Sequence, residues 1–106
     1  MKKILFFLSF TLSVIFSNNV LADTFYIDVR TPAEYQEKSI EGTINIPHNE
    51  ILSGMSQHNI KKEDTIVLFC RSGKRAGVAL TNLKLAGYKD VTSIGGFEDA
   101  KAILNK

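Results

Sequence analysis

Short apolar runs alternate with amphipathic segments along most of the chain. Residues 24–29, 66–69 and 91–94 are rich in aromatic and β-branched side chains, which is typical of β-strands. The run at residues 66–69 is continuously apolar, as expected for a central strand covered on both faces. Residues 44–46 predict a brief extended piece that ends at Pro47.

Helix signals lie between and after these strands. Thr31 can cap a helix, Pro32 fits its first turn and Glu34 completes a capping box, so a short helix is expected to run to about Lys38. Apolar residues at helical spacing predict a longer helix that stops at Gly87. This longer helix is expected over residues 75–86. A short amphipathic helix or loop is expected before it, over residues 49–58, and a closing helix after it, over residues 97–104. Strands alternating with helices predict an α/β fold with a mostly parallel central sheet.

The first 22 residues show the three regions of a secretory signal peptide. Lys2 and Lys3 precede the apolar run of residues 4–16, and a short polar stretch leads to Ala22. That run is shorter than the roughly 20 residues that a membrane-spanning helix needs. We expect cleavage after Ala22, with an uncleaved anchor or another cleavage position as alternatives. The mature protein is then expected in a bacterial periplasm, with no stable membrane association.

Composition limits what the remaining chain can be. The sequence has 106 residues, so residues 23–106 are expected to form one domain with a shallow site. We also expect a monomer. The formal net charge of +2 is accounted for by Lys2 and Lys3 in the leader, which leaves the domain neutral. A nucleic-acid partner is therefore not expected, because its electrostatic footprint is missing.

Cys70 is the single cysteine of the chain and directly follows the predicted central strand. In an exported protein it cannot form an internal disulfide, so it is reactive, intermolecular or an inert core residue. The segment from Cys70 to Arg75 lies between a strand and a helix start, where backbone N–H groups and the helix dipole favour an anion. This field and three cationic side chains favour the thiolate, while Gly73 lets the backbone curl around an anion. The alternative is a buried cysteine beside a basic surface loop.

Several sequence blocks resemble those of the rhodanese family and follow one another in the family's order. The loop matches the pattern C-R-x-G-x-R, and the other blocks are Asp28 to Arg30 with Pro32, Glu34 and Tyr35, then residues 42–47, and finally residues 94–97. The chain is most similar to single-domain periplasmic thiosulfate sulfurtransferases of the phage-shock type. This resemblance implies a single rhodanese-like domain, with helices on both faces of its sheet.

The resemblance also implies a reaction. Cys70 is expected to take a sulfane sulfur from thiosulfate, release sulfite and pass the sulfur from a persulfide to cyanide or a thiol. Arg71 and Arg75 are expected to bind the thiosulfate oxygens, since guanidinium groups form forked hydrogen bonds with such anions. The loop residues expected at the substrate are Arg71, Ser72, Gly73, Lys74 and Arg75. Neither a metal nor an organic cofactor is expected.

Two other functions fit parts of this pattern. One is phosphatase or arsenate-reductase chemistry. Low-molecular-weight and dual-specificity phosphatases have five residues between cysteine and arginine, whereas four residues separate Cys70 from Arg75 here. The tighter loop suits a sulfur atom better than a phosphoryl group. The other alternative is a non-catalytic persulfide carrier or anion-binding module that serves a protein partner.

Supporting roles are expected for residues near the first strand. Asp28 could accept N–H groups of the active loop or satisfy nearby helix termini. Arg30 and Glu34 are interpreted as an ion pair that fixes the loop, worth about 0.5 kcal/mol if exposed. His48 and His58 have no further ligands at metal-binding spacing and are interpreted as surface or loop residues.

Two positions depart from the family pattern. Phe97 stands where a tryptophan often follows the glycine pair, and Ser39 stands where many members carry a histidine. Gly95 and Gly96 are interpreted as turn residues.

Overall fold

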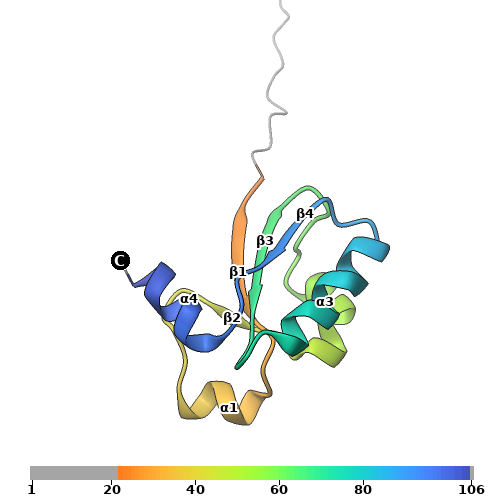
Figure 1. Ribbon diagram of the computed structural model, residues 1–106. Coiled ribbons are helices and arrows are strands. Elements are labelled where there is room, and N and C mark those ends of the chain that lie inside the picture. Colours follow the sequence, from red (N-terminus) through yellow and green to blue (C-terminus); the bar gives the residue numbers. More distant parts are fainter. Residues whose placement is uncertain (1–21, 106) are drawn as a thin grey trace, which may run out of the picture.

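The computed structural model describes residues 22–105, which form a parallel sheet of four strands with helices on both faces (Figure 1). This confirms the predicted α/β class. The leader predicted over residues 1–22 lies outside the described residues, except for Ala22. Within residues 22–105, no helix has the length and apolar character needed to cross a membrane.

The predicted elements are present, with ends shifted by a residue or two. The strands are β1 (Thr24–Asp28), β2 (Ile44–Asn45), β3 (Thr65–Phe69) and β4 (Asp90–Ser93). The helices are α1 (Pro32–Glu37), α2 (Ile51–Gln57), α3 (Lys74–Leu85) and α4 (Phe97–Leu104), and the 3-10 helix η3 (His48–Glu50) leads into α2. The segment at residues 49–58, left open between helix and loop, is therefore largely helical.

The order of the strands positions the functional site. The sheet runs β2-β1-β3-β4, so the chain leaves β1 toward one edge and β3 toward the other. Ligands of open α/β sheets bind at such a switch point, outside the carboxyl ends of the strands. Asp28 pairs with Phe69 at those ends, and the loops that begin at Val29 and Cys70 emerge side by side. A site formed by these two loops is expected from topology alone.

The two faces of β3 face different helices, because successive side chains of a strand point in opposite directions. Leu68 and Cys70 pack into the larger core cluster together with Ala76 and Ala79 of α3. Phe69 joins a smaller cluster on the opposite face, where α4 contributes Phe97 and Ala100. Cys70 thus points toward the start of α3.

Candidate active site

The sulfur of Cys70 lies in a cradle of backbone N–H groups. Cys70 is completely buried. Its Sγ accepts hydrogen bonds from the backbone nitrogens of Gly73, at 3.0 Å, and Ala76, at 3.4 Å. These nitrogens belong to the first turn of α3, whose N–H groups have no partner within the helix. The cradle therefore favours negative charge on this sulfur.

Gly73 allows the loop to curl into this shape. Its φ of 101° lies in the left-handed region, which residues with a side chain rarely adopt. A Cβ atom there would also stand 3.3 Å from the Cα of Gly95. The predicted role of Gly73 in shaping the loop agrees with this geometry.

The Gly95–Gly96 pair supports the active loop, which the interpretation as turn residues did not foresee. The carbonyl of Gly95 accepts a hydrogen bond from the nitrogen of Cys70 at 3.2 Å, and the nitrogen of Phe97 donates to the carbonyl of Arg71 at 3.2 Å. Ser72 and Gly96 also form an isolated antiparallel bridge. The backbone on both sides of the cysteine is thus fixed to the start of α4.

We expect Gly96→Ala to damage this contact. A Cβ at Gly96 would lie 2.4 Å from the carbonyl oxygen of Arg71, so one of the two backbones must move. The variant should lose about 1–3 kcal/mol of stability and lower sulfur transfer, because the loop is displaced. Gly77→Ala in α3 is the matched control, since nothing lies within 4 Å of its added Cβ. Equal unfolding midpoints and equal activity for the two variants would contradict this role of Gly96.

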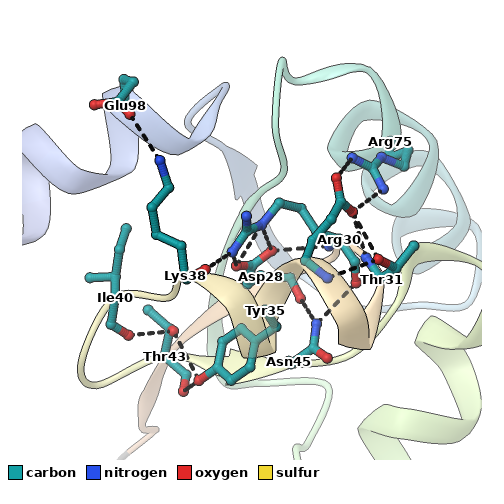
Figure 2. A network of polar contacts seen from close by, with 11 residues as sticks. Asp28, Arg30, Thr31, Tyr35, Lys38, Ile40, Thr43, Asn45, Arg75 and Glu98 are labelled. Carbon is teal, nitrogen blue, oxygen red and sulfur yellow. Dashed lines mark hydrogen bonds and ion pairs between the residues drawn. The ribbon is translucent and has the colours of Figure 1, made fainter.

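Asp28 and Arg30 form a buried ion pair beside the loop (Figure 2). Both carboxylate oxygens of Asp28 accept hydrogen bonds from the Arg30 side chain, at 2.8–3.0 Å, and Oδ1 also accepts from the Arg30 backbone nitrogen. The guanidinium also donates to the carbonyl of Lys38. Asp28 therefore binds Arg30 rather than the N–H groups of the active loop.

The predicted ion pair between Arg30 and Glu34 is wrong. Arg30 turns inward because the buried carboxylate of Asp28 requires a countercharge. Glu34 instead binds Arg75, whose two terminal nitrogens donate to its two oxygens at 2.8 and 3.1 Å. Glu34 also completes the predicted capping box with Thr31. It thus connects the start of α1 to the last residue of the active loop.

This geometry gives Arg75 a fixed partner that the sequence did not indicate. Hydrogen bonds from the Arg75 guanidinium hold the pKa of Glu34 at about 2, below its ordinary 4.5. The same pair raises the pKa of Arg75. The guanidinium of Arg75, expected at the substrate, is therefore held by a carboxylate.

Glu34 should make stability depend on pH in the acid range. Its pKa is lower in the folded than in the unfolded state, so its contribution is present above about pH 4.5 and lost as the pH falls toward 2. Both side chains are about a quarter exposed, so we expect no more than about 1 kcal/mol at pH 6. In urea unfolding, the difference between wild type and Glu34→Gln should shrink by about half at pH 3. Glu37→Gln, on the same helix, should show no such change, and a difference for Glu34→Gln that is constant with pH would contradict the pair.

A cleft of about 670 Å³ opens beside Arg71, the residue that follows Cys70. Its wall carries the Phe97 ring, with the guanidinium carbon of Arg30 4.5 Å and the ammonium of Lys38 4.8 Å from the ring centroid. Three acidic and three basic side chains join this aromatic residue in the lining: Glu34, Glu37, Glu98, Arg30, Lys38 and Arg71. Arg30 and Lys38 pair with the carboxylates of Asp28 and Glu98, whereas no such pair is found for Arg71 within the part of the chain that the structure describes. Phe97 thus has a clear place in the site, whereas its sequence signal was only a position after two glycines.

The remaining loop side chains face solvent. Arg71, Ser72 and Lys74 are exposed. His48 begins η3 and His58 ends α2, and no cluster of three or more His, Cys, Asp or Glu side chains within the described part of the chain could hold a metal ion. The structure thus brings together the cysteine loop and the segment after β1.

Comparison with known proteins identifies the family. The family model of the rhodanese-like domain matches residues 16–102. The chain belongs to this family, as the cysteine loop and its accompanying blocks predicted.

Individual relatives agree with this assignment. The thiosulfate sulfurtransferase PspE of Escherichia coli K12 is 36% identical over 88 residues, covering 83% of this chain and 85% of that protein. The chloroplastic thiosulfate sulfurtransferase 16 of Arabidopsis thaliana is 37% identical over 87 residues, covering 73% of this chain and 72% of its own length. Among solved structures, a rhodanese with anions from E. coli superposes with a TM-score of 0.67 at 36% identity, covering 72% of this chain and 89% of that one.

Proposed function

We propose that this protein is a thiosulfate sulfurtransferase that carries sulfur on Cys70. The observation that carries the proposal is the cradle around Sγ, in which Gly73 and Ala76 donate backbone hydrogen bonds to the sulfur. Backbone donors aimed at the sulfur stabilise negative charge on it, as a nucleophile that forms a covalent intermediate requires. The names of the E. coli and Arabidopsis relatives support thiosulfate as the sulfur donor.

The reaction takes place in two displacements. In the first, the Cys70 thiolate attacks the sulfane sulfur of thiosulfate, a new S–S bond forms, and the S–S bond of thiosulfate breaks with its electron pair leaving on sulfite. In the second, cyanide or a thiolate attacks the outer sulfur of the persulfide, and the electron pair of that S–S bond returns to Sγ. The products are thiocyanate or a new persulfide, and the thiolate is regenerated.

The loop residues divide the work of binding. Arg71 lines the cleft and is exposed, so we assign it the thiosulfate oxygens. Lys74 adds positive charge and Ser72 a hydroxyl at the mouth of the cradle. The guanidinium of Arg75 is paired with Glu34, so only its remaining N–H groups can bind thiosulfate. Its main contribution is to fix the end of the loop. The cradle N–H groups point at Sγ, so they stabilise the negative charge that returns to this atom in the second displacement, in the manner of an oxyanion hole.

We also propose that the chain works in the periplasm as a monomer after its leader is removed. The three-region pattern of the first 22 residues supports export. Cleavage after Ala22 leaves β1 intact, because that strand begins at Thr24. Mass measurement of the exported protein tests this processing directly.

Steady-state kinetics test the proposed reaction. With thiosulfate and cyanide as substrates, we expect one sulfite and one thiocyanate per turnover. We also expect parallel double-reciprocal lines, the pattern of a covalent enzyme intermediate. Converging lines would show that both substrates must bind together, and absence of thiocyanate would exclude the activity.

A further inference from the structure

A buried carboxylate lies at the amino ends of the central strands, opposite the active site. Asp64 is 4% exposed and directly precedes β3, whereas Cys70 directly follows it. Because β1 and β3 are parallel, the start of β1 lies at the same edge, where Thr24 pairs with Thr65. The backbone nitrogen of Thr65 donates to the carbonyl of Asp23 at 2.8 Å. The site described above makes no use of Asp64.

The partners of this carboxylate are backbone amides. Oδ2 of Asp64 accepts a hydrogen bond from the nitrogen of Lys61 at 2.7 Å, and Oδ1 accepts from the nitrogen of Asp23 at 3.1 Å. These bonds, first that of Lys61, lower the pKa of Asp64 and keep it ionised. Among residues 22–105, no cationic side chain forms an ion pair with it. A buried charge is usually compensated by an opposite charge, and this one has only neutral donors in the unprocessed chain.

Removal of the leader changes one of these two donors. Hydrolysis of the Ala22–Asp23 peptide bond consumes one water, leaves a carboxylate on Ala22 and turns the nitrogen of Asp23 into an amine. At neutral pH the amine takes up a proton and becomes an α-ammonium group. The nitrogen that donates to Asp64 is thus the atom that acquires a positive charge.

We propose that Asp64 is the binding site for the α-ammonium group that processing creates at Asp23. The inference rests on cleavage after Ala22 and is independent of the sulfur chemistry at the other edge. The hydrogen bond at 3.1 Å already has an ionised acceptor, and processing gives it an ionised donor as well, so it becomes an ion pair. Processing thereby adds a positive charge on a direct hydrogen-bond donor of Asp64, in addition to the through-space effect of Lys61, and fastens the start of β1 to β3.

Other ionisable groups lie near Asp64 and could also titrate. Lys61 acts on Asp64 through space as well as through its backbone, and Asp90 accepts a hydrogen bond from Thr65. The ionisable side chains on the segments that meet at this edge are Asp23, Lys61, Lys62, Glu63, Tyr88, Lys89 and Asp90. They are the same in all the forms compared below, so differences between the forms isolate the α-amino group.

The test uses exported, processed protein whose first residue is verified as Asp23 by mass spectrometry. It is compared with Asp64→Asn and with a processed chain that carries one additional alanine before Asp23. The added alanine keeps that nitrogen an amide, as it is in the structure, so this second form should fold even if Asp64→Asn does not. Titration of the α-amino group by NMR and urea unfolding between pH 6 and 9.5 are measured for each form.

The wild-type α-amino group should titrate about one pH unit above its ordinary range of about 7.7–8.0, and that of Asp64→Asn within it. Since the value is raised in the folded state, the added stability is fully present below about pH 7.7 and is lost as the pH rises through the raised value. Only the wild type should show this loss. A wild-type group that titrates as in Asp64→Asn, equal pH profiles for wild type and the alanine-extended chain, or a first residue other than Asp23 would each overturn the proposal.

Discussion

Replacing Cys70 with serine should reduce sulfur transfer from thiosulfate to cyanide by at least about 10³-fold. The serine hydroxyl is not ionised at neutral pH and cannot form a persulfide, so both displacements of the proposed reaction lose their nucleophile. The backbone donors at Gly73 and Ala76 remain, and they hydrogen-bond to an oxygen as they do to a sulfur. Binding without chemistry is therefore the expected state of this variant. Thiocyanate formation at saturating thiosulfate is the measurement.

A folding control separates chemistry from structure in this variant. Serine is slightly smaller than cysteine and enters a fully buried position, so a modest loss of stability is expected. Circular dichroism and urea unfolding should still show a cooperative folded domain at the assay temperature. A folded Cys70→Ser variant that retained wild-type turnover would remove Cys70 from the mechanism.

Neutralising Asp28 should cause the largest loss of stability at a single site. The Asp28 side chain is fully buried and that of Arg30 is 6% exposed, so Asp28→Asn leaves a guanidinium inside the protein without its countercharge. Breaking a buried pair in this way costs about 3–5 kcal/mol, a large share of the roughly 5–15 kcal/mol that stabilises a typical domain. Urea unfolding at pH 7 measures the loss. Activity should fall as well, since Arg30 forms part of the cleft beside Arg71.

Glu98→Gln provides the matched control for this prediction. Glu98 also pairs with a cation, Lys38, but the atoms are 3.8 Å apart and both side chains are more than half exposed. Such surface pairs contribute about 0–1 kcal/mol. If Asp28→Asn and Glu98→Gln destabilised the protein equally, burial of the Asp28–Arg30 pair would not be the cause.

Local sequence signals predicted the elements of the fold because each rests on residues close together in the chain. The capping box is an example, since Thr31 and Glu34 satisfy each other three residues apart. Gly87 is another, since its φ of 98° ends α3 where the pattern placed a stop. The continuous apolar run of β3 likewise predicted a central strand, and β3 lies between β1 and β4.

Sequence reasoning was weaker for contacts between distant residues. Arg30 and Glu34 look like a pair because they are four apart, yet their actual partners depend on burial and on a residue 41 positions away. The contact of Gly96 with Arg71 is equally invisible, since a glycine pair signals a turn whatever packs against it. Side-chain pairing follows from the strand order, which the linear pattern did not specify. The cysteine loop was the exception, because its cradle forms within six residues of Cys70.

The most direct test of the proposed function is the mass of the intact protein before and after incubation with thiosulfate. We expect the wild type to gain one sulfur atom, cyanide to remove it again and Cys70→Ser to gain nothing. Cyanide removal distinguishes a persulfide from stable oxidation of the thiol, which adds oxygen instead. A wild type that forms thiocyanate but never gains sulfur, or a Cys70→Ser variant that gains it equally, would contradict transfer through Cys70.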